Sequence, residues 1–194
     1  AERQPVDALR LLQEAPGRAL SETECQALQQ LAETSPGHLR RIAHLLAAQR
    51  SAAAVDALLA DNPNLELIIM PFVPGSEDDD ANLEAARAVH EAGVATCVPA
   101  EGLIASGGVD FFLAGSTRGA GQGARLGVHS WAAGDGLEGG DLPKDHPDHV
   151  MFLEYYADIG IEEAFYWFTL EAAPAAGIHW MSPAEMETYG VLTQ

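Results

Sequence analysis

Short apolar runs alternate with helical patterns between residues 65 and 129, and this alternation limits the possible folds more than any other feature of the chain. The runs Leu65–Met70, Val94–Val98 and Arg125–His129 have the length and composition of buried strands. Helical patterns separate them, one over residues 76 to about 91 and one over residues 106 to about 115. Strands joined by helices form parallel sheets with right-handed crossovers, so the sequence predicts an α/β fold.

Capping residues predict two of the helix starts. Ser76 and Asp79 have the spacing of a capping box, followed by an acidic first turn. Ser182, Pro183 and Glu185 combine an N-cap serine, a proline at the first helical position and a glutamate three residues after the cap. Both helices are therefore predicted to begin directly after a serine.

Three further segments complete the prediction along the chain. Ser51–Leu59 is a helix of alanines and leucines, and residues 151–170 form an aromatic-rich helical stretch with a break at Gly160. Residues 132–149 are rich in Gly, Asp and Pro and are predicted to form a long loop.

The length and the hydrophobic content predict one well-buried domain. The chain has 194 residues, of which 47% are hydrophobic, and this is enough for a single core. Residues 1–40 are predicted to form an N-terminal helical extension, and residues 41–194 are predicted to form the α/β domain.

The strong negative charge argues against two classes of partner. Asp and Glu number 29 against 10 Lys and Arg, so the formal net charge is −19, and Lys144 is the single lysine. Nucleic acids and anionic membrane surfaces both need a positive patch, so neither is expected as a partner of this acidic protein. No apolar run approaches the roughly 20 residues of a membrane-spanning helix, so no membrane insertion is expected.

A serine and a histidine 23 residues apart lie in segments typical of active-site turns. Ser106 stands between Gly102-Leu103-Ile104-Ala105 and two glycines, and His129 ends an apolar strand. The pattern predicts a nucleophile at a helix N-terminus and a base on a neighbouring strand. Two simpler interpretations stay open, in which Ser106 caps its helix and His129 is a half-buried strand histidine bonded to the backbone.

Four motifs in the same order resemble those of the Clp protease/crotonase superfamily, and within it the bacterial, often exported branch of Clp-protease-like proteins. They are Val73-Pro74-Gly75-Ser76, the turn Gly102–Ser106 with the helix that follows to Ala114-Gly115, the segment Ala124–His129, and Trp180–Glu185 with Tyr189-Gly190-Val191. The resemblance covers roughly residues 40–194 and implies a repeated β-β-α superhelical core. It also implies a homo-oligomer, built on trimers or rings, and a serine hydrolase, most simply a peptidase that acts on a peptide or a small acyl substrate without a cofactor.

The same resemblance assigns a role to five residues. Ser106 is the implied nucleophile and His129 the implied base, because a serine hydroxyl needs a group that takes its proton. The N–H of Gly107 and that of Gly75 or Ser76 are the implied donors of an oxyanion hole.

The chain departs from the superfamily at the third member of the catalytic triad. The position of the usual acid is occupied by Ile178, so the histidine lacks the carboxylate that would fix its tautomer and stabilise its charged form. Asp110, four residues after Ser106, is the candidate substitute acid, and Glu171 and Asp158 are further candidates.

The cysteines bear on the compartment. Members of the exported branch often carry cysteines beside the nucleophile, but Ile104 and Gly108 stand there in this chain. Cys25 and Cys97 are the two cysteines, and their spacing is not that of a zinc site. The resemblance still favours an exported or periplasmic protein over a cytoplasmic one.

Two other interpretations of function stay open. The missing acid favours a weak or inactive relative that serves as a binding or assembly module. Acyl-thioester chemistry of the crotonase type is disfavoured, because a chain this acidic offers little for the phosphates of a CoA group.

Two segments outside these motifs also carry expectations. The loop Asp145-His146-Pro147-Asp148-His149 holds carboxylates and imidazoles, yet its proline and its setting favour a solvated turn, and no metal is expected. The consecutive aromatics Phe165, Tyr166, Trp167 and Phe168 cannot all face one core, so some are expected to line a groove or a subunit interface.

Overall fold

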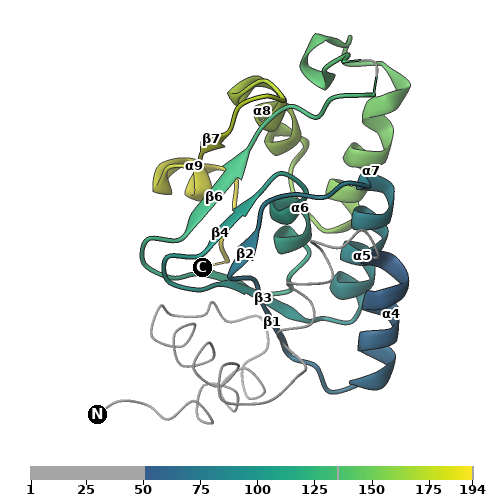
Figure 1. Cartoon of the computed structure of the whole chain (residues 1–194), viewed down its shortest axis with the longest axis vertical. Helices are drawn as coiled ribbons and strands as arrows, with labels where there is room; N and C mark the ends of the chain where they lie inside the picture. Colours follow the sequence, from purple (N-terminus) through teal and green to yellow (C-terminus); the bar gives the residue numbers. More distant parts are fainter. Residues whose placement is uncertain (1–50, 135, 194) are drawn as a thin grey trace.

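The computed structural model describes residues 51–134 and 136–193 (Figure 1). The predicted helical extension over residues 1–40 and Cys25 lie outside the described residues. In chain order the elements are α4 (Ser51–Asp61), β1 (Leu67–Ile69), β2 (Phe72–Val73), α5 (Asp79–Glu91), β3 (Ala95–Val98), β4 (Leu103–Ala105), α6 (Gly107–Leu113), β5 (Arg118–Ala120), β6 (Arg125–Val128), the 3-10 turns η1 (Gly139–Asp141) and η2 (Pro147–His149), α7 (Val150–Asp158), α8 (Glu163–Ala172), β7 (His179–Trp180) and α9 (Pro183–Thr188).

The strands form two small sheets, with the orders β1-β3-β5 and β2-β4-β6-β7. All neighbours in the first sheet are parallel, and in the second sheet only β7 runs antiparallel, beside β6. Each strand of the first sheet is followed along the chain by a strand of the second, and α5 and α6 connect successive pairs. The predicted α/β class is confirmed, with parallel pairing in both sheets.

The predicted strands match the most deeply buried segments. All residues of β1 and β3 are buried, as expected for parallel strands covered on both faces. Cys97 in β3 is fully buried. The strands β2, β4, β5 and β7 were not predicted, because runs of two or three residues carry no readable periodicity.

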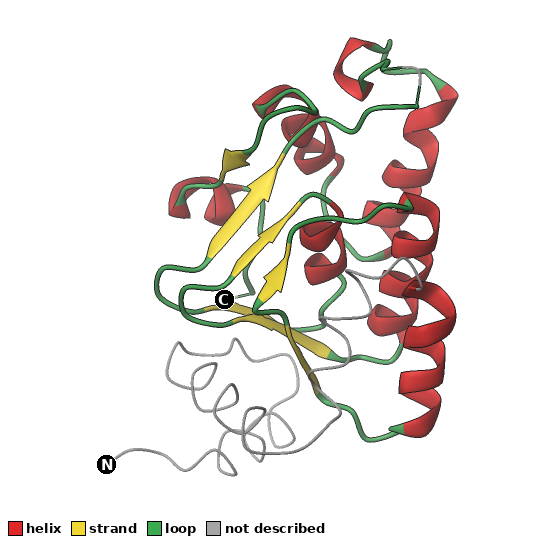
Figure 2. Cartoon of the chain, in the orientation of Figure 1, coloured by secondary structure: helices red, strands yellow, loops and turns green. Residues whose placement is uncertain are grey.

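Helix α5 lies in the middle of the helical layer. It contacts α4, α6 and α7, whereas α6 contacts the strands β3, β4 and β6. Figure 2 shows α4, α5 and α7 along one side with the strands on the other. Leu83, Ala86 and Val89 form its buried face. The predicted helix and its end before Gly93 are confirmed, but the predicted cap is wrong: Asp78, and not Ser76, accepts a hydrogen bond from the N–H of Ala81.

The C-terminal part follows the prediction closely. The aromatic stretch forms α7 and α8, separated at Gly160, which has a φ of 73°. The capping box of Ser182 and Glu185 is present at the start of α9.

Tyr155, Tyr156 and Phe165 are almost completely buried, and each such side chain contributes roughly 1.5–3 kcal/mol of hydrophobic free energy. Across the described residues, no helix is both long enough and apolar enough to span a bilayer.

Candidate active site

The site is assembled at the carboxyl ends of three neighbouring parallel strands. Strand β2 leads into Pro74-Gly75-Ser76, β4 leads into Ser106, and β6 leads into His129. Ala105 at the end of β4 pairs with Gly127 near the end of β6, so the two segments leave the sheet side by side. In sheets of parallel strands, ligands bind at this edge.

Ser106 occupies a strained turn between β4 and α6. Its φ of 53° and ψ of −131° are unusual for a residue with a side chain, and such a conformation costs about 1–3 kcal/mol. Its N–H donates to the carbonyl of Gly127 at 2.9 Å. Its side chain makes no capping hydrogen bond to α6, so the interpretation of Ser106 as a simple helix cap is wrong. A serine on a sharp strand-to-helix turn presents its hydroxyl above the sheet.

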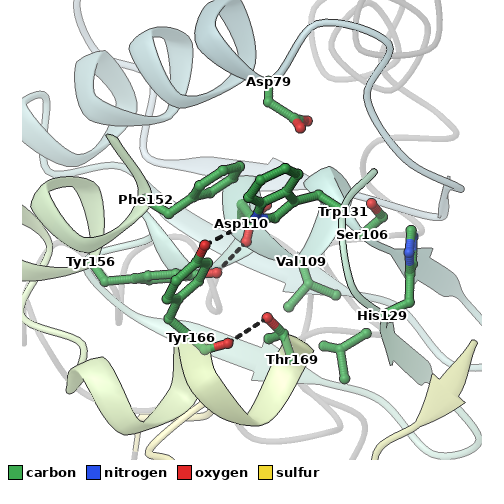
Figure 3. A pocket seen from close by; sticks show the side chains of 11 residues that line it. Asp79, Ser106, Val109, Asp110, His129, Trp131, Phe152, Tyr156, Tyr166 and Thr169 are labelled. Carbon is green, nitrogen blue, oxygen red and sulfur yellow. Dashed lines mark hydrogen bonds between the residues drawn. The ribbon is translucent and has the colours of Figure 1, made fainter. Parts of the chain in front are cut away.

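His129 lines the same pocket as Ser106 (Figure 3). It is half-buried, and its Nδ1 lies 2.7 Å from the carbonyl oxygen of Ser130. Because a carbonyl only accepts, this contact places the proton of the neutral ring on Nδ1 and leaves the lone pair on Nε2. The histidine is thus bonded to the backbone, as the simpler interpretation proposed, and it also faces the pocket.

The predicted acid position lies beside the histidine. In the antiparallel pair of β6 and β7, Gly127 pairs with Trp180 and Val128 with His179, so the same register places Ile178 opposite His129. The side chain of Ile178 is 40% exposed. The residue opposite His129 is therefore apolar, and no carboxylate stands at position 178.

Asp110 lines the pocket but is engaged by a different partner. Its Oδ1 accepts a hydrogen bond from the hydroxyl of Tyr156 at 2.5 Å, and its backbone carbonyl accepts one from Tyr155 at 2.6 Å. Burial raises the pKa of the Asp110 carboxyl to about 7, against the smaller lowering by the Tyr156 hydrogen bond, and the nearby Asp79 raises it further. The pocket thus brings Asp110 together with Ser106 and His129, but the hydrogen bond of its carboxylate goes to Tyr156.

The other candidate acids lie away from the pocket. Asp158 forms an exposed ion pair with Arg87 at 2.8 Å, and Glu171 is exposed on α8. Neither residue is among those that line the pocket.

The predicted oxyanion-hole residues meet around the nucleophile. A methyl group at Gly75 would lie 3.7 Å from the Cβ of Ser106, and one at Gly107 would lie 2.1 Å from the Oγ of Ser76. The close approach of Ser76 therefore requires glycine at position 107. Asn82, which is buried on α5, donates to the carbonyl of Gly107 at 2.9 Å, and this hydrogen bond holds the turn in place.

Aromatic side chains form the rest of the pocket wall. They are Trp131, Phe152, Tyr156 and Tyr166, with Val109, Val128 and Thr169 between them. The indole N–H of Trp131 donates to the hydroxyl of Tyr166 at 2.9 Å, and that hydroxyl lies 2.6 Å from Nδ1 of the buried His149. The pocket opens to solvent, and its cavity volume is about 30 Å³.

Several of these wall residues were missed from the sequence. The expectation that some of residues 165–168 would line a groove holds for Tyr166, whereas Phe165 is buried in the core. Nothing local singled out Trp131, Phe152 or Asn82, since their positions depend on tertiary packing.

The Asp145–His149 loop separates its two imidazoles. His146 accepts the N–H of Asp148, and His149 turns into the aromatic cluster, with 6.5 Å between the two ring centres. Over residues 51–134 and 136–193, no three His, Cys, Asp or Glu side chains are grouped so that they could hold a metal ion.

Comparison with known proteins gives a distant structural likeness only. The scan of family models and the search of curated proteins found no match. A solved structure of the 1510-N membrane-bound stomatin-specific protease, a point mutant in complex with a substrate peptide, aligns with a TM-score of 0.47 and 17% sequence identity. The alignment covers 73% of this chain and 66% of that structure. A similarity of this size assigns no residue, substrate or activity to the present chain.

Proposed function

We propose that this protein is a serine hydrolase of the peptidase type, with Ser106 as the nucleophile and His129 as the base. The observation that carries the proposal is the strained Ser106 turn, whose hydroxyl caps no helix and shares a pocket with His129. Backbone strain of this kind clusters at active sites, where the surrounding structure holds it in place.

The proposed mechanism uses the geometry of the three strand ends. Nε2 of His129 takes the proton of the Ser106 hydroxyl as its oxygen attacks the substrate carbonyl. The N–H groups of Gly107 and of Gly75 or Ser76 stabilise the negative oxygen of the tetrahedral intermediate. His129 then returns the proton to the leaving amine, and water hydrolyses the acyl-enzyme by the same route.

The proposal is tested by labelling with a fluorophosphonate probe, which forms a covalent bond with an activated serine. We expect the wild type to be labelled, and Ser106→Ala to lose the label entirely. His129→Ala should be labelled at least about 100-fold more slowly, because a general base contributes roughly 10²–10⁴-fold. The matched control is Ser116→Ala, which removes an exposed serine hydroxyl outside the pocket and should leave labelling unchanged. Equal labelling of Ser106→Ala and wild type would remove Ser106 from the mechanism.

A second candidate function is favoured by Ile178. An exposed apolar side chain at the position of the acid is expected if the chain is an inactive relative that binds partners or assembles. Folded wild-type protein that never reacts with the probe would favour this function.

Three further features belong to the same proposal: the type of fold, the oligomeric state and the location. We propose that the successive strand pairs are repeats of a Clp/crotonase-type β-β-α superhelix, and that the protein forms trimer-based or ring-shaped homo-oligomers. We also propose an exported or periplasmic location. Light scattering after size-exclusion chromatography tests the oligomer, and a monomer at micromolar concentration would contradict it.

A further inference from the structure

The pocket beside Ser106 combines aromatic side chains with carboxylates. Figure 3 shows Trp131, Phe152, Tyr156 and Tyr166 around a space that Asp79 and Asp110 also border, with Ser106 and His129 to one side. Among the described residues that line this space there is no lysine and no arginine. The two carboxylates of the pocket therefore face no lysine or arginine, and His129 is the one basic side chain in its described lining.

Asp110 is the carboxylate placed deepest in this arrangement. Its Oδ1 accepts from Tyr156, and in the part of the chain that the structure describes its Oδ2 accepts no hydrogen bond. The titratable groups that face it are Asp79 from α5, Tyr155 and Tyr156 from α7, Tyr166 from α8 and, across the pocket, His129. Arg87 and Arg118 carry permanent positive charges, but they act on Tyr155 and neither lines the pocket.

The pKa of the Asp110 carboxyl is raised to about 7 in this setting. Burial is the main cause of the increase, and repulsion from Asp79 adds to it. A cation that entered the pocket would stabilise the ionised carboxylate and lower this pKa. Aromatic faces attract the same kind of ligand, since a cation within about 6 Å of a ring centre is stabilised by the ring quadrupole. Phe152 is stacked between Trp131 and Tyr166, so the outer faces of this stack belong to Trp131 and Tyr166.

We infer that this pocket binds the alkylammonium group of a substrate, such as a lysine side chain, next to the bond that Ser106 attacks. The inference rests on the proposed function and adds the class of substrate. Asp110 follows Ser106 by four residues, and four residues of helix correspond to a backbone rise of ~6 Å. A flexible four-carbon stem with a terminal ammonium has a length of this order.

The other side-chain classes fit the pocket less well. An acidic side chain would face two carboxylates of the same sign, Asp79 and Asp110. A purely apolar side chain would contact the rings but would leave the Asp110 carboxylate without a cation. A neutral hydrogen-bonding group competes only while Asp110 is protonated, so its affinity should fall as the pH rises.

The test measures binding rather than turnover, so it does not depend on catalysis. The probes are n-butylammonium chloride and n-butanol, at matched chloride concentration, added to wild type and to Ser106→Ala. The signal is the indole N–H resonance of Trp131, which is one of three tryptophans in the chain. We expect n-butylammonium to bind with a Kd in the millimolar range and at least fivefold more tightly than n-butanol.

Asp110→Asn and Glu154→Gln form a matched pair of variants. Both remove one negative charge, but Glu154 is exposed on α7 outside the pocket. Asp110→Asn keeps an oxygen that accepts from Tyr156, and it should weaken n-butylammonium at least fivefold, whereas Glu154→Gln should leave its Kd unchanged. The Kd of the wild type should also fall about tenfold from pH 6 to pH 8, as the ionised fraction of Asp110 rises. Repeating the pH series in His129→Gln removes the contribution of that imidazole.

The outcomes separate this inference from the proposed function. Equal affinities for n-butanol and n-butylammonium, an unchanged Kd in Asp110→Asn, or no Trp131 shift at 50 mM probe would each overturn the alkylammonium subsite. Failure of fluorophosphonate labelling would overturn the hydrolase and leave the binding result standing. Selective ammonium binding that depends on Asp110 supports the subsite whether or not the serine reacts.

Discussion

Replacing Asp110 by asparagine should change how the stability of this protein depends on pH. The pKa of the Asp110 carboxyl is 3.8 in a solvated chain and about 7 in the folded protein, because burial disfavours its ionised form. The folded state therefore binds the proton more tightly than the unfolded state. Below about pH 4 Asp110 does not lower the free energy of unfolding. As the pH rises from there to about 7, its ionisation lowers this free energy progressively, and above that pH it causes no further change.

The size of the effect follows from the two pKa values. At about 1.4 kcal/mol for each pH unit between them, full ionisation costs about 4 kcal/mol of folding free energy. At pH 5 part of this cost is already present, so about 2.5 kcal/mol remains to be lost between pH 5 and pH 8. Because the pocket is open to water, which screens the charge, we expect a measured change of about 1–2.5 kcal/mol.

The assay is urea unfolding of wild type and Asp110→Asn at pH 5, 6, 7 and 8. Asparagine retains the acceptor for Tyr156 but cannot ionise, so the free energy of unfolding of the variant should rise relative to wild type as the pH increases. Subtracting the two proteins removes the contribution of the many other acidic groups. Glu154→Gln, an exposed change of the same charge, should give a difference from wild type that is flat within about 0.5 kcal/mol. A similarly flat difference for Asp110→Asn would refute the claim that Asp110 is held at a raised pKa.

Two further substitutions test the strand ends. Ile178→Asp places a carboxylate opposite His129 in the β6–β7 register, and the fold should tolerate it because Ile178 is 40% exposed. We expect fluorophosphonate labelling at least tenfold faster than in the wild type. An unchanged rate would mean that the added carboxylate does not reach the imidazole. Gly107→Ala would place a methyl group 2.1 Å from Ser76 Oγ, so the turn must move. Labelling should be lost, and urea unfolding should show about 1–3 kcal/mol of destabilisation. In the control Gly134→Ala the added methyl group meets nothing within 4 Å, so neither measurement should change.

The sequence predicted those parts of the site that depend on local chemistry. Ser106 and His129 stand at the ends of predicted elements, and the structure places both at one pocket. Apolar runs of four or more residues were recognisable as strands, and capping residues marked α9. These signals lie within a few neighbouring residues, where propensity and capping act directly.

The parts that were missed depend on contacts between distant segments. Strand β2 has two residues and β4 has three, so the pairing of β2 with β4 and of β4 with β6, and not their composition, makes them strands. Trp131 enters the pocket because its indole bonds to Tyr166, 35 positions later in the chain. Ser76 was expected to cap α5, but its hydroxyl donates to Asp79 at 2.6 Å while Asp78 makes the cap.

The state of Asp110 connects the two proposals for this pocket. The carbonyl of Ser130 can fix the tautomer of His129, but it carries no full charge and stabilises a protonated imidazole less than a carboxylate would. Asp110 does not fill that role, because its carboxylate is bonded to Tyr156 and is about half protonated at pH 7. Because Asp110 does not support the histidine, we expect slow proton transfer from Ser106. The Asp110 carboxylate is then also available to a cationic substrate. Slow chemistry and selectivity for alkylammonium groups should therefore occur together in this protein, and Asp110→Asn should abolish the selectivity without abolishing the labelling of Ser106.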